Sequence, residues 1–148
     1  DKSNYHRIQQ WIEEAIQKGA KLLTNGICDE SHHFIAPTLL TSTKKDMKVV
    51  SEEVFCPFAI IEKYKTFADA IQFCNDSQYG LQAGVFTNNI KFMKTAHNEL
   101  EVGGVIINNI PGFRIDTMPY GGVKNSGFGR EGIRYTMEEM TEPRLIVY

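Results

Sequence analysis

The chain has 148 residues, of which 42% are hydrophobic and 23% charged, and its formal net charge is −2. These values are typical of a folded globular chain large enough to bury a core, and they exclude a disordered protein. The small net charge gives no argument for nucleic acid or an anionic membrane as a partner, and no apolar run is long enough for a transmembrane helix.

The first predicted element is an amphipathic helix near the N-terminus. Ser3 is its expected N-cap, and Gly19 is its expected stop signal. Its apolar residues recur at helical spacing and would form one face: Tyr5, Ile8, Ile12, Ala15 and Ile16. A helix of this kind needs a partner surface for that face.

Short strands are predicted next, at residues 21–23 and 34–40, on either side of a turn at Asn25-Gly26. Pro37 lies inside the second run and has no backbone N–H to donate, so we expect that strand to be an edge or bulged strand. The continuous apolar run at residues 58–61 is expected to be a buried strand.

Helices and strands alternate after this point. Thr66 followed by Asp69 has the pattern of a capping box at a helix start, and Asn89 is expected to cap the next helix. Strands are predicted at residues 84–87 and 102–107. Alternation with short connections predicts an α/β fold with a mostly parallel sheet flanked by helices.

The alternation stops in a glycine-rich segment at residues 108–129. A loop of this length inside a compact domain is usually functional. A final helix from about residue 130 to 139 precedes a terminal strand at residues 144–148, whose β-forming residues would present an unpaired edge.

The cysteines and histidines predict no metal site. Cys28, Cys56 and Cys74 are odd in number, widely spaced and free of any Cys-x-x-Cys pair. This pattern argues against a disulfide framework and favours a reducing compartment, so we expect a cytoplasmic protein. A solvated loop explains the adjacent pair His32-His33 better than metal ligation does.

Two motifs carry the functional interpretation. Residues 52–57 are Glu-Glu-Val-Phe-Cys-Pro, and residues 119–131 are Pro-Tyr-Gly-Gly-Val-Lys-Asn-Ser-Gly-Phe-Gly-Arg-Glu. In this order and spacing they resemble the C-terminal part of NAD(P)-dependent aldehyde dehydrogenases, and the resemblance covers nearly the whole chain. That family has its nucleophilic cysteine and general-base glutamate farther upstream of Glu52 than the 51 residues present here. The resemblance therefore implies that no catalytic residue lies in this chain.

The resemblance also implies an organisation. Residues 1–143 would form the C-terminal part of the catalytic domain, and residues 144–148 an oligomerisation strand that joins copies of the chain. The parent enzyme would oxidise a small-molecule aldehyde to a carboxylic acid with NAD or NADP as hydride acceptor, while the fragment alone would be inactive. The alternative is a stand-alone, non-catalytic module that uses the same fold for binding or assembly.

Glu53 and Phe55 are the expected cofactor-binding residues. In the family, the second glutamate of this motif accepts hydrogen bonds from the nicotinamide ribose hydroxyls, which suits a carboxylate because it offers only acceptors. The phenylalanine packs beside the ribose and nicotinamide. The alternative is a charged turn before a buried strand, with Phe55 in the core.

Cys56 departs from the family pattern, which usually has glycine at this position. We interpret it as a small packing residue, because two adjacent glutamates would raise the pKa of its thiol. Glycine can serve a backbone conformation that cysteine tolerates poorly, so the local geometry is in question.

Tyr120 and Phe113 are the expected substrate-binding residues, because they match family positions that face the aldehyde tunnel. The loop from Phe113 to Tyr120 resembles the branch that contains lactaldehyde and non-phosphorylating glyceraldehyde-3-phosphate dehydrogenases. In the latter, an arginine of this loop helps bind the substrate phosphate, which would be Arg114 here. An internal ion pair of Arg114 with Asp116 is an equally weighted alternative.

The glycines of the second motif match neither Gly-x-Gly-x-x-Gly nor the phosphate-loop pattern. We therefore expect close-packed turns rather than a phosphate cradle. Arg130 and Glu131, at the end of the motif, are expected to belong mostly to a solvated face.

Overall fold

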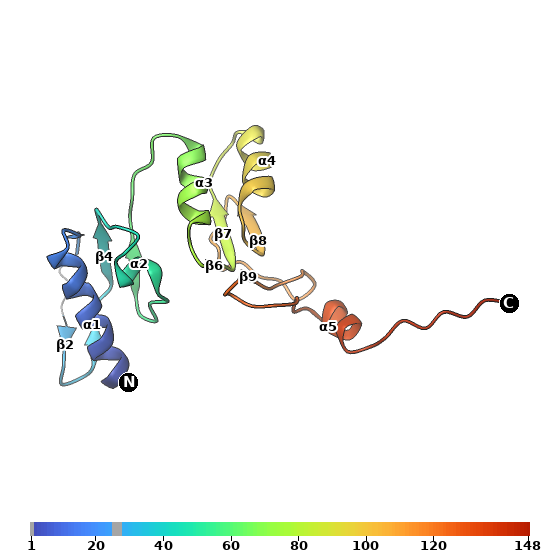
Figure 1. Ribbon diagram of the computed structural model, residues 1–148, viewed down its shortest axis with the longest axis horizontal. Helices are drawn as coiled ribbons and strands as arrows, with labels where there is room; N and C mark the ends of the chain where they lie inside the picture. Colours follow the sequence, from blue (N-terminus) through green and yellow to red (C-terminus); the bar gives the residue numbers. More distant parts are fainter. Residues whose placement is uncertain (1, 25–27) are drawn as a thin grey trace. The chain divides into compact units, whose positions relative to one another are not determined.

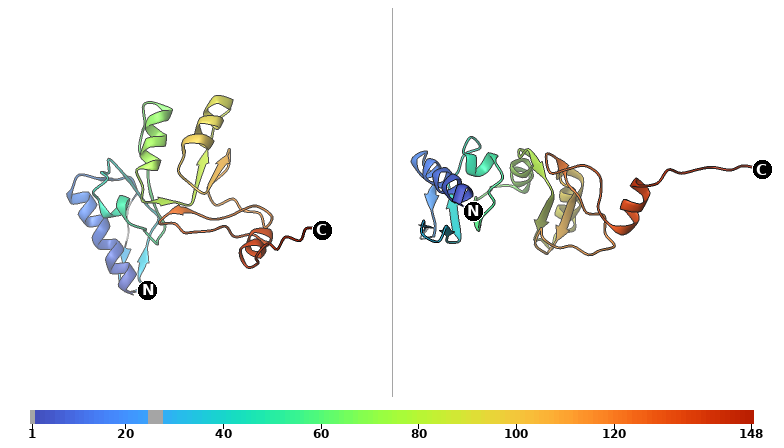
Figure 2. Two further views of the ribbon diagram at one scale, coloured as in Figure 1. Left: turned by 45° about the vertical axis from the view of Figure 1, so that its right-hand side comes forward. Right: turned by 90° about the horizontal axis from the view of Figure 1, so that it is seen from below.

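The computed structural model describes residues 2–24 and 28–148 (Figure 1, Figure 2). The chain divides into two compact units, Asp1–Lys63 and Tyr64–Tyr148. Within the described residues there are five helices and nine short strands. In residues 2–24 and 28–148, none of the helices has the length and apolar character that crossing a bilayer requires.

Helix α1 (Lys2–Gln17) packs its apolar face into the core of the first unit, as its periodicity predicts. The helix begins at Lys2, so Ser3 lies in its first turn and is not its N-cap. Gly19 has φ +103°, and its N–H donates to the Ile16 carbonyl oxygen at 3.0 Å. A left-handed glycine that closes the last turn is a common helix end, which confirms the predicted stop.

The sheet of the first unit has the strand order β1 (Lys21–Leu22), β4 (Thr38–Thr41), β5 (Phe58–Ile60). β1 runs antiparallel to β4, and β5 runs parallel to it. The predicted buried strand is therefore an edge strand, and its central residue Ala59 is exposed. β4 is the middle strand, so of the two alternatives for residues 34–40, an edge or a bulged strand, the edge position is wrong for β4.

Residues 34–40 form two strands where one was predicted. β3 (Phe34–Ile35) pairs antiparallel with β2 (Cys28–Asp29), while β4 pairs elsewhere. Pro37 lies at the break, where its missing N–H removes a ladder hydrogen bond. The turn predicted at Asn25-Gly26 falls outside the described residues.

The core of the first unit is formed by α1, the strands and the start of the short helix α2 (Lys48–Ser51). Leu40 is fully buried, and Met47, just before α2, is 1% exposed. Partly buried apolar residues pack around this core, among them Val54, Cys56 and Phe58. The Glu-Glu-Val-Phe-Cys-Pro segment at residues 52–57 therefore lies against a packed core.

The second unit contains a β-α-β arrangement. β7 (Gln82–Val85) and β8 (Gly104–Ile107) are parallel, and α4 (Ile90–Glu99) connects them, as expected for parallel neighbours. Helix α3 (Phe67–Asn75) lies beside α4, and the rings of Phe67 and Phe92 stack at 4.5 Å (Figure 2).

Both predicted helix caps of this unit are present. Thr66 and Asp69 form the reciprocal capping box at the start of α3. The Asn89 side chain accepts a hydrogen bond from the Lys91 N–H at the start of α4. These contacts satisfy backbone N–H groups that the helices leave without a partner.

The rest of the second unit is built around the glycine-rich segment. β6 (Tyr79–Gly80) pairs antiparallel with β9 (Val123–Lys124), and α5 (Ile133–Glu139) follows. In the described chain, residues 144–148 pair with no strand, and their last four side chains are 75–107% exposed. A β-strand forms only when it pairs with another strand. Without such a partner, the β-forming residues at 144–148 do not form the predicted strand.

The expectation of a mostly parallel sheet is wrong, although the α/β class holds. The described strands form four small sheets with two parallel pairs, β4–β5 and β7–β8, and three antiparallel pairs. Strand direction depends on which strands meet. Each antiparallel pair contains at least one two-residue strand, which is too short to produce a pattern in the sequence.

Candidate functional site

Residues 52–57 connect α2 to β5, and from Glu53 to Cys56 their side chains alternate in exposure. Val54 and Cys56 are half-buried against the core of the first unit. Glu53 is exposed, and Phe55 is 71% exposed. The interpretation that Phe55 is a core residue is therefore wrong, and the carboxylate and the ring both lie outside the core.

The backbone of this segment is held by hydrogen bonds on both sides of Phe55. Asn4 Nδ2 on α1 donates to the Phe55 carbonyl oxygen at 3.0 Å. The Thr38 N–H on β4 donates to the Pro57 carbonyl oxygen at 2.9 Å, and the Cys56 N–H donates to the Val54 carbonyl oxygen at 3.0 Å. Neighbouring elements thus position a segment whose functional side chains stay accessible.

The Glu53 carboxylate is available to a ligand. Among the described residues, no side chain forms a hydrogen bond or an ion pair with it, and a carboxylate can accept from two adjacent hydroxyl groups at once.

Cys56 is a packing residue, as predicted, but for a different reason. Burial is the main cause that raises the pKa of its thiol, Cys28 adds to it, and the Arg7 guanidinium acts in the opposite direction. The neighbouring glutamates are not among these causes. Cys56 also has no positive φ, so the backbone here does not require glycine.

In the second unit, Tyr120 and Glu131 form an antiparallel bridge. The Tyr120 N–H donates to the Glu131 carbonyl oxygen at 3.0 Å, and the Glu131 N–H donates to the Tyr120 carbonyl oxygen at 2.6 Å. The bridge brings the two ends of the second motif together and leaves Tyr120 half-buried.

Arg114 joins this bridge. Its guanidinium carbon lies 4.3 Å from the centre of the Tyr120 ring, and its Nη2 lies 2.9 Å from Glu131 Oε2. The alternative of an ion pair with Asp116 is therefore wrong, because Arg114 pairs with Glu131. The partner lies 17 residues away and reaches Arg114 only through the bridge, so the local sequence could not indicate it.

Phe113 occupies a turn in which its N–H donates to the Ile110 carbonyl oxygen at 3.2 Å. Its ring is 41% exposed, and within residues 2–24 and 28–148 it stacks on no other ring. The structure thus brings Arg114 and Tyr120 together but does not add Phe113 to that pair.

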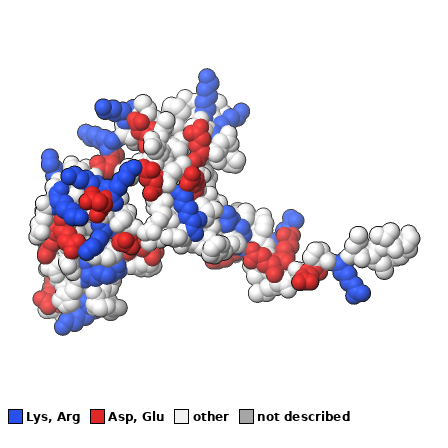
Figure 3. Space-filling view, viewed as in Figure 1, with Lys and Arg blue, Asp and Glu red and all other residues white. Residues whose placement is uncertain are grey.

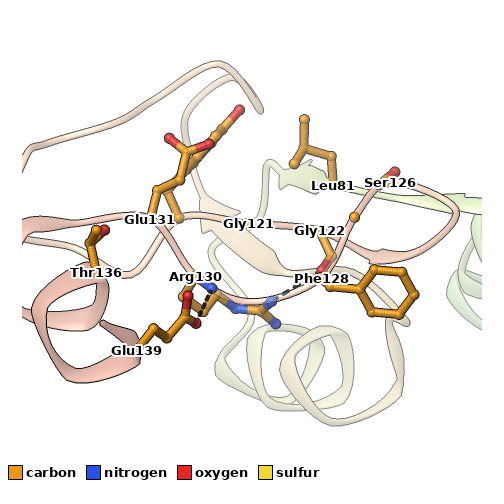
Figure 4. A pocket seen from close by; sticks show the side chains of 11 residues that line it. Leu81, Gly121, Gly122, Ser126, Phe128, Arg130, Glu131, Thr136 and Glu139 are labelled. Carbon is orange, nitrogen blue, oxygen red and sulfur yellow. Dashed lines mark hydrogen bonds between the residues drawn. The ribbon is translucent and has the colours of Figure 1, made fainter. Parts of the chain in front are cut away.

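A cavity of about 280 Å³ lies beside the glycine turns (Figure 4). Arg130 lines it, and its Nη1 donates to the carbonyl oxygens of Gly122 at 3.0 Å and Gly129 at 2.7 Å. The Arg130 N–H donates to Glu139 Oε1 at 3.1 Å. Arg130 is therefore a clamp on the turns and not part of a solvated face.

The glycines here are required by close packing, as expected. A Cβ added to Gly121 would lie 2.6 Å from the Gly129 carbonyl oxygen, and one added to Gly122 would collide with Ser126. Such clashes leave no room for a larger residue.

Charges and histidines give no further site. On the face shown in Figure 3, acidic and basic side chains are interspersed. Across the described part of the chain, no three His, Cys, Asp or Glu residues are placed to hold a metal ion.

Comparison with known proteins gives a consistent result. The sequence model described as the aldehyde dehydrogenase family matches residues 1–146. A 3-sulfolactaldehyde dehydrogenase of Priestia aryabhattai is 49% identical over 141 residues, which cover 95% of this chain and 29% of that protein. A lactaldehyde dehydrogenase of Methanococcus maripaludis (strain C7) is 46% identical over 142 residues, which cover 95% of this chain and 30% of that protein.

Solved structures agree over the same extent. Aldehyde dehydrogenase 21 from Physcomitrella patens, in complex with the reaction product succinate, has a TM-score of 0.91 and 41% identity, over 96% of this chain and 29% of that one. Glyceraldehyde-3-phosphate dehydrogenase GapN from Methanocaldococcus jannaschii, complexed with NADP, has a TM-score of 0.86 and 38% identity, over 95% and 30%. The chain thus spans about 30% of the length of these proteins.

Proposed function

The chain belongs to the aldehyde dehydrogenase family, and on that basis we propose that it is part of a longer NAD(P)-dependent enzyme that oxidises an aldehyde to a carboxylic acid. Its first unit holds the nicotinamide half of the cofactor, and its second unit forms one wall of the aldehyde pocket. A cysteine and a glutamate outside this chain supply the nucleophile and the base. Glu53 and Phe55 would hold the nicotinamide half of the dinucleotide, which would supply the hydride acceptor when bound.

One observation carries the cofactor assignment. The side chains of Glu53 and Phe55 are exposed, while hydrogen bonds from α1 and β4 hold the backbone of their segment in place. The exposed carboxylate suits two adjacent ribose hydroxyls, which donate to it. The exposed ring of Phe55 offers apolar surface to the sugar and the nicotinamide. A buried Phe55, or a Glu53 already paired with another side chain, would argue against the role of these residues in cofactor binding.

On the substrate side, Tyr120, Arg114 and Phe113 line the aldehyde pocket, and Arg114 binds an anionic group of the aldehyde. The aromatic support beneath the guanidinium favours this role, because stacking keeps Arg114 oriented. The names of the relatives are in line with it, since sulfolactaldehyde, glyceraldehyde 3-phosphate and succinate all carry an anionic group. Lactaldehyde, named for other relatives, is neutral.

Residues 144–148 pair with a strand from another copy of the chain and join subunits of a homo-oligomer. Support comes from their composition and exposure. Leu145, Ile146 and Val147 are 75–86% exposed, and a β-forming segment without a partner tends to add to another strand.

Replacing Glu53 with glutamine in the longer protein tests the cofactor assignment. The amide keeps the size but loses hydrogen bonds to a charged acceptor, worth about 1.5–3 kcal/mol. We expect the KM for the cofactor to rise about ten- to a hundredfold. The melting temperature should stay constant, because among residues 2–24 and 28–148 no side chain pairs with the Glu53 carboxylate. Steady-state kinetics with varied cofactor and a melting curve measure both.

Glu52→Gln is the matched control, since it removes the same charge from the adjacent exposed residue. It should leave the KM for the cofactor nearly unchanged. Unchanged kinetics together with a lower melting temperature in Glu53→Gln would show a structural carboxylate and contradict the assignment.

A further inference from the structure

Arg114 is already paired with a carboxylate of its own chain. Its Nη2 lies 2.9 Å from Glu131 Oε2, and the two side chains are 44% and 66% exposed. An open hollow of about 590 Å³ adjoins the pair and is also lined by Asp116, Ile133 and Met137. The cation thus lies at the edge of a space that a small ligand can enter, with a carboxylate of its own chain already beside it.

We propose that Glu131 is a specificity-determining residue that competes with an anionic group of the substrate for Arg114. The inference rests on the proposed function, because it concerns which aldehydes the pocket selects. A substrate sulfonate, phosphate or carboxylate either displaces Glu131 or binds beside it. In both cases the Glu131 carboxylate opposes binding of the anionic aldehyde and leaves a neutral aldehyde unaffected.

Part of the Arg114 guanidinium remains accessible, so the Glu131 carboxylate and a substrate anion can both approach it. Only Nη2 donates to Glu131, and among the described residues Nε and Nη1 of Arg114 have no acceptor. An arginine fork can hold an oxyanion through two N–H groups at once. An anion bound at this edge lies close to the Glu131 carboxylate, and two like charges a few ångströms apart repel each other even near water.

The Glu131 side chain is not needed to hold the loop. Its backbone, not its carboxylate, forms the bridge to Tyr120. An exposed ion pair adds little to stability. Stacking on Tyr120 keeps Arg114 in place when the carboxylate is lost. Removing the charge of Glu131 therefore changes the electrostatics at Arg114 and leaves the architecture intact.

The test uses Glu131→Gln in the longer protein and two aldehydes that differ by one charge. The pair is 3-sulfolactaldehyde and lactaldehyde, which lacks the sulfonate. The quantity measured is the ratio of kcat/KM for the first to that for the second, which cancels any common change in turnover. We expect the ratio to rise about three- to tenfold, through a lower KM for the sulfonate.

Two variants separate competition from a general charge effect. Asp116→Asn removes a carboxylate that lines the same hollow but does not pair with Arg114, so the ratio should stay constant. When Glu131→Gln is combined with Arg114→Met, the rise in the kcat/KM ratio should disappear, because the cation that the substrate anion would bind is absent. A gain that persists without Arg114, or an equal gain in Asp116→Asn, overturns the proposal.

Binding of a stable product gives a readout that does not depend on turnover. Calorimetry measures the dissociation constants of 3-sulfolactate and lactate with the unsubstituted protein and with Glu131→Gln. We expect only 3-sulfolactate to bind about three- to tenfold more tightly to the variant. Equal dissociation constants before and after the substitution overturn the inference. Tighter 3-sulfolactate binding in a protein that oxidises no aldehyde supports the competition for Arg114 and overturns the proposed function.

Discussion

Burial raises the pKa of the Cys56 thiol, although Arg7 works against it. A thiol with a raised pKa is mostly neutral near pH 7, and the neutral form is a weak nucleophile. Packing against the core of the first unit accounts for the residue without any chemical role. Burial and packing therefore give no support to Cys56 as a nucleophile.

We predict that iodoacetamide alkylates Cys56 more slowly than free cysteine at pH 7.5, and that the rate increases as the pH rises through and above 9.0, the ordinary pKa of a thiol. Peptide mapping by mass spectrometry measures the rate at each pH. Alkylation faster than that of free cysteine would mean an activated thiolate.

The raised pKa of Cys56 also makes the folding stability depend on pH. The folded pKa of Cys56 lies above the unfolded one, so its contribution to stability is complete below the unfolded pKa. That contribution is lost as the pH rises through the folded pKa.

At the scale of elements, Lys124 connects three segments of the second unit. Its Nζ donates to the carbonyl oxygens of Asn75 at 2.7 Å and Ser77 at 3.1 Å, at and just beyond the C-terminus of α3. The same Nζ lies 2.6 Å from Glu101 Oε2, ahead of β8. A cation suits the carbonyl end of a helix. Lys124 also has φ +54°, so the end of β9 adopts an uncommon conformation to reach these partners.

We predict that Lys124→Met lowers the stability of the chain by about 1–3 kcal/mol, because partly buried carbonyl groups lose a charged donor. Its side chain is only 25% exposed, so water replaces the lost contacts incompletely. Thermal melting measures the loss, and hydrogen exchange should accelerate in β6 and β9. Lys94→Met on the exposed face of α4 is the control. An equal loss of stability in both variants would contradict the role of Lys124 in connecting these segments.

At the scale of the whole molecule, the two units differ in how much core they contain. Of the buried hydrophobic residues among those described, only Ile71 and Ala96 belong to the second unit. That unit exposes large apolar side chains instead, including Phe86, Ile90 and Phe128 at 62–102%. Apolar surface of this kind is usually covered by a partner, which agrees with the proposal that further segments of a longer enzyme pack there.

We predict that the 148-residue chain alone oxidises no aldehyde. It contains the proposed cofactor clamp and pocket wall, but the family resemblance locates the nucleophile and base outside it. NADH and NADPH formation, followed by absorbance with lactaldehyde and 3-sulfolactaldehyde, measures this, with the longer protein as positive control. Turnover that disappears in Cys56→Ser would contradict both this prediction and the packing role of Cys56.

Local signals in the sequence predicted local structure well. The helical periodicity of α1, the capping box of Thr66 and Asp69, the Asn89 cap and the stop at Gly19 are all confirmed, because each depends on residues within one or two helical turns. The family was also evident from two motifs, because their residue types and spacing are specific. Strand direction, the middle position of β4 and the edge position of β5 were not predictable in this way, since they depend on which distant segment lies alongside.

The amino-acid sequence by itself determined the α/β class, the stop of α1 at Gly19, the caps of α3 and α4 and the family of this protein. The tertiary structure alone decided that Phe55 is exposed, that Arg114 pairs with Glu131 and not with Asp116, and that Arg130 clamps glycine turns. The physical reason is the range of the interactions. Caps and periodic faces arise between near neighbours in the chain, whereas exposure and ion pairing depend on segments that only the folded chain brings together.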